Sequence, residues 1–325
     1  MALVDQFERK ADYLRIAVTD RCNLRCRYCM PAHGIDFVNR KELLSYDEIV
    51  RLANIFKDSG VNKVRVTGGE PFVRRDMDVL IQSLCEIFQS VHITTNASLI
   101  HEHMPLLKHP HIQSLNISLD SLCAKTFANI TRRDEFEMVH RNILKALNEG
   151  ITVKLNMVVM KGVNDHEIPA FVNFGRTHGT EVRFIEAMPF NEYDGNKDLF
   201  LSHDAILKRI TSAFTTVEPR VDSLNSSSLK YEVDGLTRIG IIPAYTRSLC
   251  GTCNRIRLTS KGDMLTCLYA KVGVNLRDKM RLENLSDEAL KEIIHAAVWK
   301  KRKSGLEEEE LRHETVFQSM TSIGG

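Results

Sequence analysis

The length and composition of this chain exclude several kinds of protein. A chain of 325 residues is too long for a minimal fold and suits one large domain with an appendage, or two domains. Hydrophobic residues at 43% and charged residues at 26% are ordinary for a soluble globular protein. With 44 Lys and Arg against 42 Asp and Glu, the net charge of +2 gives no support for wholesale binding to nucleic acid or to a membrane.

The first twenty residues contain several charged side chains and no apolar core segment. We therefore expect no signal peptide, and no later run is long enough to span a bilayer. These features predict a cytoplasmic protein. In that compartment the 8 cysteines indicate metal or redox chemistry before disulfides, and six of them fall into two tight groups.

Strands separated by helices are predicted over the first part of the chain. Hydrophobic patterns predict the strands over residues 13–19, 63–67, 91–95, 112–119, 151–159 and 181–187. Ser45 and Glu48 match a capping box that begins one connecting helix, and apolar stripes predict two others over residues 76–88 and 135–149. Strands and helices that alternate at this spacing indicate a parallel sheet built from βα units.

The two faces of the predicted strands differ in character. One face is aliphatic, whereas the other carries Arg15, Thr19, Arg65, Thr67, His92, Thr94, Asn96, Asn116, Ser118, Asp120, Lys154 and Asn156. Because a closed eight-stranded barrel fills its interior with branched aliphatic residues, this polar lining predicts an open, partial (β/α)6 TIM-like barrel around a polar, anionic ligand. An ordinary sheet with one solvated face is the weaker alternative, since parallel sheets normally have both faces covered.

The rest of the chain has a different pattern. Ser202 is expected to cap a helix that runs to about residue 214, and short strands follow over residues 230–233 and 237–242. A hairpin over residues 255–266 and a last helix over residues 286–300 come next. We therefore predict a barrel domain over residues 1–215 and a smaller α+β domain over residues 216–325. The basic run 300–303 and the acidic run 307–310 are interpreted as solvated faces or a flexible stretch.

The first group of cysteines, Cys22, Cys26 and Cys29, lies on the loop after the first strand with the spacing C-x3-C-x2-C. Three thiolates on one loop suit a cubic iron–sulfur cluster, with one cysteine on each of three irons and the fourth iron open to a small molecule. A zinc site that takes His33 as its fourth ligand is the alternative. An iron–sulfur cluster with an open iron would make this loop a reactive site, whereas a zinc site with four protein ligands would only stabilise the fold.

Two further motifs support a site at the same mouth of the barrel. Gly68-Gly69-Glu70-Pro71 ends the second strand, where the glycines allow the backbone to approach a ligand and Glu70 can accept a hydrogen bond from an ammonium group. A second group of cysteines, Cys250, Cys253 and Cys267, flanks the predicted hairpin.

The three-cysteine loop with an aromatic residue before its last cysteine, together with the Gly-Gly-Glu-Pro strand end, resembles the radical S-adenosylmethionine (SAM) enzymes. The second cysteine group, with Arg255, Arg257 and the terminal Gly-Gly, narrows the resemblance to the GTP 3′,8-cyclase family of molybdenum cofactor biosynthesis. The resemblance covers almost the whole chain. It implies two [4Fe-4S] clusters and SAM as cofactors, and GTP as the substrate.

The resemblance also implies a role for individual residues. Its cluster ligands are Cys22, Cys26 and Cys29 for the first cluster and Cys250, Cys253 and Cys267 for the second. Its SAM contacts are Tyr28, Gly69, Ser118 and Met188. Its GTP contacts are Arg15, Arg65, Thr94, Lys154, Arg255 and Arg257, with Arg183 as a further phosphate contact. The resemblance assigns no catalytic side chain. One departure is Asn96-Ala97, where the family usually has Asn-Gly.

The reaction that the resemblance implies is a radical rearrangement of GTP. A 5′-deoxyadenosyl radical takes hydrogen from C3′ of the ribose, and the sugar radical attacks C8 to give (8S)-3′,8-cyclo-7,8-dihydroguanosine 5′-triphosphate. The implied partners are a reductant protein for the first cluster and the downstream cyclic pyranopterin monophosphate synthase. A homodimer, a role for Cys123 and entry of the Gly324–Gly325 tail into the active site are left open.

Two alternatives remain at this point. A radical SAM enzyme that modifies a peptide would use the second cluster for electron transfer, but such enzymes typically carry more C-terminal cysteines than three. A zinc-binding nucleic-acid module would use both cysteine groups, but the near-neutral charge and the lack of a basic, aromatic-rich stretch argue against it.

Overall fold

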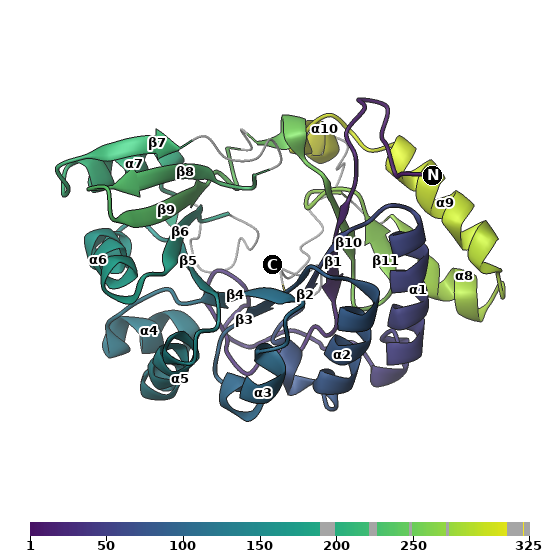
Figure 1. Cartoon of the computed structure of the whole chain (residues 1–325), viewed down its shortest axis with the longest axis horizontal. Helices are drawn as coiled ribbons and strands as arrows, with labels where there is room; N and C mark the ends of the chain where they lie inside the picture. The colour runs from purple at the N-terminus through teal and green to yellow at the C-terminus, as the bar shows by residue number, and fades with distance from the viewer. Residues whose placement is uncertain (189–198, 221–225, 247–248, 271–272, 311–320, 322–325) are drawn as a thin grey trace.

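A computed structural model of the chain describes residues 1–188, 199–220, 226–246, 249–270, 273–310 and 321. Its described strands form one sheet in the order β12-β11-β10-β1-β2-β3-β4-β5-β6-β9-β8-β7 (Figure 1). The middle of this sheet is parallel and follows chain order, with β1 Tyr13–Ala17, β2 Lys63–Thr67, β3 Val91–Thr95, β4 Ile112–Ser118, β5 Val153–Val159 and β6 Glu181–Glu186. The sheet curves without closing, so the expected partial barrel is confirmed.

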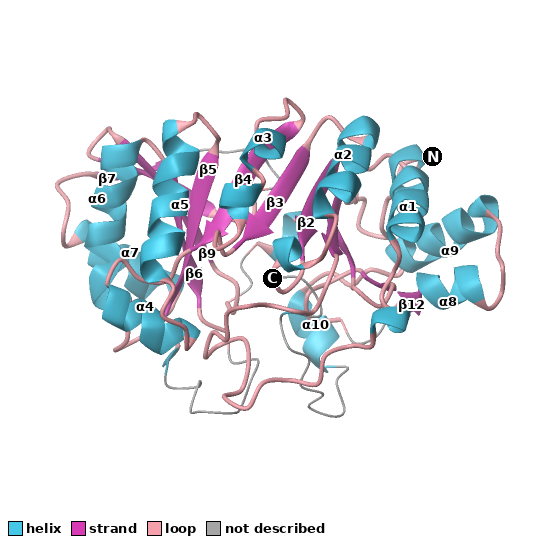
Figure 2. Ribbon diagram, turned by 90° about the horizontal axis from the view of Figure 1, so that it is seen from below, coloured by secondary structure: helices cyan, strands magenta, loops and turns pink. Residues whose placement is uncertain are grey.

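Helices cover the outer face of the curved sheet, as Figures 1 and 2 show. They are α1 Tyr46–Asp58, α2 Met77–Ile87, α3 Met104–Leu107, α4 Ala124–Thr131, α5 Phe136–Asn148, α6 Ile168–His178 and α7 His203–Thr211. Short 3-10 helices connect them at η1 Arg40–Glu42, η2 Pro71–Val73, η3 Ile100–Glu102 and η4 Asp165–Glu167. The predicted capping box is present at the start of α1, where the Ser45 hydroxyl accepts from the Glu48 N–H and the Glu48 carboxylate accepts from the Ser45 N–H.

The core lies between the sheet and these helices. Leu14 and Ile16 of β1 and Val64 and Val66 of β2 are fully buried, and they belong to one apolar cluster with Phe56 of α1. Burial of side chains of this size contributes about 1.5–3 kcal/mol each. Truncation of Phe56 to alanine is expected to cost about 3–5 kcal/mol. The aliphatic face of each strand therefore meets the helices, and the polar face is left for the interior of the barrel.

The C-terminal part of the chain extends both edges of the barrel sheet. At one edge β10 Arg255–Leu258 pairs parallel with β1 and continues into β11 Asp263–Leu265 and β12 Val274–Asn275. At the other edge β9 Thr237–Ile242 pairs parallel with β6 and continues into β8 Leu229–Val233 and β7 Val217–Arg220. The remaining elements are η6 Cys250–Thr252, α8 Leu276–Arg281, α9 Asp287–Trp299 and α10 Gly305–Glu310. The division of the chain at residue 215 stays a prediction.

Some details differ from the sequence-based expectations. Lys301, within a basic run expected to be solvated, is only 3% exposed, whereas Lys300, Arg302 and Lys303 are exposed. The helix capped by Ser202 ends at Thr211 rather than near residue 214. No helix in the described part of the chain is long and apolar enough to cross a membrane.

Candidate active site

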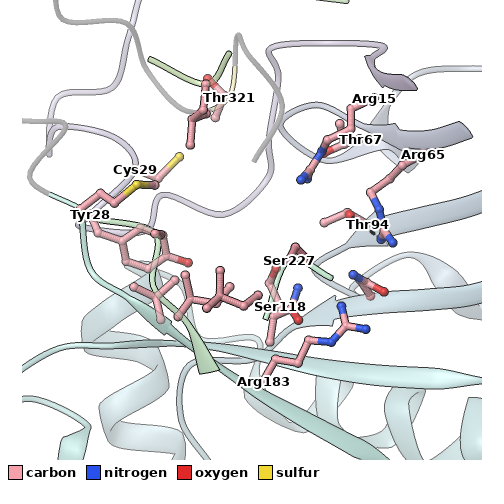
Figure 3. A pocket seen from close by; sticks show the side chains of 18 of the residues that line it. Arg15, Tyr28, Cys29, Arg65, Thr67, Thr94, Ser118, Arg183, Ser227 and Thr321 are labelled. Atoms are coloured by element: carbon pink, nitrogen blue, oxygen red, sulfur yellow. Dashed lines mark hydrogen bonds between the residues drawn. The ribbon is translucent and has the colours of Figure 1, made fainter. Parts of the chain in front are cut away.

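A cavity of about 340 Å3 opens inside the barrel, where the carboxyl ends of the parallel strands meet. Both groups of cysteines line it, together with most of the polar face of the sheet: Arg15, Arg65, Thr67, Thr94, Asn96, Asn116, Ser118, Asp120, Asn156 and Arg183. Figure 3 shows Arg15, Arg65 and Arg183 on one side of this space and Tyr28 and Cys29 on the opposite side. The cavity therefore has a cationic side and a thiol side.

The first cysteine loop forms the thiol side. The N–H groups of Cys29 and Met30 both donate to the Cys26 carbonyl at 2.9 Å, which folds the loop into a tight turn. Burial raises the pKa of Cys22 to about 12 and raises that of Cys26 as well. Because metal ligands must be thiolates, occupation of this site releases protons. His33, the alternative zinc ligand, is not among the described residues that line the cavity.

The Gly68-Gly69 turn packs directly against the start of this loop. The Gly69 N–H donates to the Thr19 carbonyl at 2.8 Å, and a Cβ atom on Gly69 would lie 2.2 Å from the Arg21 carbonyl oxygen. Gly68 has a φ of +150°, and a Cβ atom there would lie 2.4 Å from the Thr19 oxygen. Only glycine fits at these two positions, and both line the cavity.

Glu70 takes a different role from the one expected. Its carboxylate is completely buried and accepts from the N–H groups of Phe72 at 3.2 Å and Asn96 at 2.7 Å, and from the Thr95 hydroxyl at 2.9 Å. Burial raises its pKa to about 7, and these three hydrogen bonds oppose that shift. Glu70 therefore ties the end of β2 to the end of β3, and it is not among the described residues that line the cavity.

Tyr28, Gly69, Ser118 and Met188, the four predicted SAM contacts, all line the cavity. The Tyr28 hydroxyl donates to Asp120 Oδ2 at 2.8 Å, and the Val158 N–H donates to Asp120 Oδ1 at 2.9 Å. Asp120 thereby fixes the side chain of Tyr28, which lies within the first cysteine loop. Sequence reasoning placed Asp120 on the polar face but did not give it this role.

The cationic side is built from a row of arginines across three strands. In the parallel register, Arg15 of β1 lies opposite Arg65 of β2 on one side and opposite Arg257 of β10 on the other. Burial lowers the pKa of Arg15, and the charge of Arg257 lowers it further. Burial, with the charge of Arg255, lowers the pKa of Arg257 to about 10. Like charges this close favour an anionic ligand among them.

Tyr13 lies within this arginine row and was missed from the sequence. Its hydroxyl accepts a short hydrogen bond from Arg65 Nε, and the Lys63 ammonium lies 4.6 Å from the centre of its ring. Burial raises the pKa of Tyr13, but the charges of Arg65, Arg15 and Lys63 outweigh burial and lower it to about 7. Alternation along the strand places Tyr13 on the same face as Arg15, so the sequence pattern could have predicted that Tyr13 faces the cavity.

Lys154 and Arg183 both engage Glu181, which sequence reasoning also missed. Glu181 Oε2 lies 3.2 Å from Lys154 Nζ, while Glu181 Oε1 lies 2.7 Å from Arg183 Nε and 3.0 Å from Lys230 Nζ. Burial raises the pKa of Glu181, and these cations outweigh burial and lower it to about 2. Arg183 lines the cavity; Lys154 does not. Glu181 and Arg183 are two residues apart on one strand, so their side chains lie on the same face and could have been predicted to pair.

The second cysteine group lies at the cavity wall beside β10. Cys250 belongs to η6, and Cys253 and Cys267 line the cavity with it. Burial raises the pKa of Cys253, but the charges of Arg255 and Lys301 outweigh burial and lower it to about 6. Arg255 Nε donates to Cys253 Sγ at 3.4 Å. Arg255 therefore faces the cluster loop and the cavity together.

The donor sets fit the groups that the sequence implies. Among the described residues, no three His, Cys, Asp or Glu side chains are grouped to hold a single metal ion. A four-iron cluster instead takes one thiolate at each of three separate irons, as each cysteine group supplies. The side-chain oxygens of Asn116 and Asn156 are buried at the cavity with no hydrogen-bond partner, so they are open to a donor on a bound ligand. Cys123 lies outside the cavity as the N-cap of α4, and the Gly324–Gly325 tail lies outside the described residues.

Comparisons with known proteins agree with this geometry. Residues 16–175 match the radical SAM superfamily, and residues 180–306 match the family described as Molybdenum Cofactor Synthesis C. The chain is 40% identical to the GTP 3′,8-cyclase of Hydrogenovibrio crunogenus over the full length of both chains. It is 40% identical to the mitochondrial GTP 3′,8-cyclase of Arabidopsis thaliana, over 92% of this chain and 78% of that one.

Longer relatives and solved structures extend the comparison. The chain is 42% identical to molybdenum cofactor biosynthesis protein 1 of Dictyostelium discoideum, over 93% of this chain and 49% of that one, so it spans about half of that relative's length. SuiB of Streptococcus suis has a similar fold, with a TM-score of 0.63 at 17% identity over 90% of this chain and 69% of that one. From these matches, the chain belongs to the radical SAM superfamily and, within it, to the GTP 3′,8-cyclase family.

Proposed function

We propose that the protein is a GTP 3′,8-cyclase that uses SAM and two [4Fe-4S] clusters to convert GTP to (8S)-3′,8-cyclo-7,8-dihydroguanosine 5′-triphosphate. The observation that carries this proposal is that one cavity is lined by both three-cysteine groups and by the arginine row. A radical source and a site for a polyanion therefore share one cavity. The names of the relatives support GTP as that polyanion.

The cationic side is the proposed binding site for the triphosphate. Arg15, Arg65, Arg257 and Arg183 present guanidinium groups to the cavity, and guanidinium forks match phosphate oxygens in pairs. Thr94 accepts from Arg65 Nη1 at 3.2 Å, so it helps to orient that fork. Lys154 is a proposed further contact that must leave Glu181 to reach a phosphate.

The guanine base is proposed to lie at the other end of the substrate site. Arg255 faces both the cavity and Cys253, one of the three proposed ligands of the second cluster. A base held there and a triphosphate held by the arginine row would place the ribose between Arg255 and that row, in the cavity that the first cysteine group also lines.

The SAM site is proposed to lie beside the first cysteine group. Cys22, Cys26 and Cys29 are the proposed cluster ligands, and Tyr28, Gly69, Ser118 and Met188 are the proposed SAM contacts. Met188 is held by the Tyr269 hydroxyl, which lies 3.2 Å from its sulfur. Because Tyr269 is two residues from Cys267, this contact links the SAM side of the cavity to the second cysteine group.

When bound, the first cluster and SAM would supply the 5′-deoxyadenosyl radical that takes hydrogen from C3′ of the ribose. The sugar radical would then attack C8, and one further electron and a proton at N7 would complete the 7,8-dihydro product. The residues of the chain contribute position: the arginine row fixes the triphosphate, and Arg255 fixes the base end. The enclosing strands keep water from the reacting atoms. We further propose that a reductant protein supplies both electrons, one for the cleavage of SAM and one for the cyclised radical, and that the product passes to cyclic pyranopterin monophosphate synthase.

An anaerobic assay of the reconstituted, reduced protein tests this function. We expect 5′-deoxyadenosine and the cyclised nucleotide to form together, in amounts that both depend on GTP. In R65M we expect cyclisation to fall because the phosphate fork is lost, whereas the exposed Arg75 offers a matched control in R75M with activity near that of the wild type. Cleavage of SAM without any change to GTP would overturn the proposal.

A further inference from the structure

A buried lysine lies behind the second cysteine group. Lys301 follows α9 and is 3% exposed, although its neighbours Lys300, Arg302 and Lys303 are all exposed. A buried ammonium group costs several kcal/mol unless hydrogen bonds and an opposite charge compensate it. The contacts of Lys301 therefore indicate which groups compensate its buried charge.

All three acceptors of Lys301 come from one short segment. Its Nζ atom donates to the Cys253 carbonyl at 2.8 Å and to the Arg255 carbonyl at 3.0 Å, and it lies 3.7 Å from Cys253 Sγ. An ammonium group has three donors, so these contacts use all of them. Of the three acceptors, the Cys253 sulfur is the one that becomes an anion when it binds iron.

A second cation holds the same loop from the N-terminal segment. Arg9 Nη1 donates to the Cys250 carbonyl at 2.9 Å and to the Lys303 carbonyl at 2.8 Å, while Arg9 Nε pairs with Asp5 at 2.6 Å. In Figure 1 the N-terminal segment runs beside α10. Backbone positions 250 and 253 are thus each bonded to a cation from outside the loop. Of these two cations, Lys301 and Arg9, Lys301 also contacts the sulfur of Cys253, a proposed cluster ligand.

We propose that Lys301 is a positioning residue of the second cluster, which holds the Cys253 sulfur in its ligand position and raises the reduction potential of that cluster. Reduction adds negative charge to the cluster, and a fixed cation nearby stabilises the reduced form more than the oxidised form. Hydrogen bonds to ligand sulfurs act in the same direction. This inference rests on the second cluster of the proposed function.

Redox titration of the full-length, reconstituted protein tests the inference. The midpoint potentials of both clusters are followed by electron paramagnetic resonance, and addition of SAM identifies the signal of the first cluster. The variants are K301M, which removes the buried charge, K301R, which keeps it, and K300M, which removes an exposed charge one residue away. The first cluster, which the other cysteine group would hold, is the internal reference.

We expect the potential of the second cluster to shift downward in K301M, and to stay near the wild-type value in K301R and K300M. The potential of the first cluster should not move in any variant. If K301M keeps all its iron and both potentials match the wild type, the inference is wrong. If K301M holds only half of the iron, recovery of the rest in K301R supports a role for the charge, and failure to recover it overturns that role.

These readouts do not depend on turnover of GTP. A protein that holds two clusters but leaves GTP unchanged would contradict the proposed function and still report the effect of Lys301. Conversely, an active enzyme whose second cluster is indifferent to K301M would contradict only the inference.

Discussion

Arg15 and Arg257 lie directly opposite each other on the parallel strands β1 and β10, with Arg257 buried and Arg15 beside it at the cavity. This pair joins a residue near the start of the chain to one near its end. In the absence of an anion the two charges repel, and the repulsion contributes to the lowered pKa of Arg15. The fold therefore places two like charges side by side at the cavity.

The variant R257M should separate stability from substrate binding. Without the repulsion, the thermal midpoint of the substrate-free protein is expected to rise. Loss of a charged hydrogen bond to phosphate is expected to weaken GTP binding about 10- to 100-fold. Calorimetry of both properties checks this, with R238M, at an exposed arginine on β9, as the control. GTP affinity within twofold of the wild type would show that Arg257 does not contact the substrate.

Tyr13 should give the substrate-free protein a distinctive dependence on pH. Its pKa is about 7 in the folded protein and near 10.0 when unfolded, so the folded state loses the proton first as pH rises. The contribution of Tyr13 is present in full above pH 10 and is lost as pH falls through about 7. Relative to Y13F, the free energy of unfolding of the wild type should rise between these values, by at most about 1.4 kcal/mol per pH unit. Parallel curves for the two proteins would contradict the prediction.

Glu181 is expected to support the fold while it competes with the substrate. E181Q should lower the free energy of unfolding at neutral pH by about 3 kcal/mol, because the folded pKa of about 2 lies below the ordinary 4.5. The stability that the Glu181 carboxylate contributes is present in full above about pH 4.5 and is lost as pH falls through about 2. GTP affinity should rise, since Arg183 and Lys154 lose their internal partner. Weaker binding of GTP by E181Q would mean that Glu181 orients these cations for the substrate.

Ala97 has a backbone conformation that alanine rarely adopts, with φ at +63°. A97G should raise the free energy of unfolding by about 0.5–1 kcal/mol, because glycine removes the left-handed strain of Ala97. As a control, A53G within helix α1 should lower it by about 1 kcal/mol. Chemical denaturation measures both, and a loss of stability in A97G would contradict the account of the turn.

Much of the fold was predictable because local patterns determine it. Strands β2, β3 and β9 begin and end where alternation predicts, and the Ser45 and Ser202 caps were both readable from sequence. The polar face was also predictable, since side chains alternate with a period of two along a strand. The strand bounds, the helix caps and the polar face all follow from residues that are close together in the sequence.

What the sequence did not predict depends on contacts between distant residues. Nothing near Arg257 indicates that β10 pairs with β1, and nothing in a run of basic residues distinguishes Lys301 from Lys300. The pairing of Glu70 with Asn96 is similar, because the conformation of the turn decides which way the carboxylate points. Such contacts follow from the assembled sheet, so they became visible only in the structure.

The most direct test of the proposed function uses GTP that carries deuterium at C3′ of the ribose. The reduced, reconstituted protein is incubated anaerobically with SAM and this substrate, and the 5′-deoxyadenosine is analysed by mass spectrometry. The account predicts 5′-deoxyadenosine that contains deuterium, formed together with a cyclised nucleotide that has lost it from C3′. Unlabelled 5′-deoxyadenosine beside intact GTP would contradict the account.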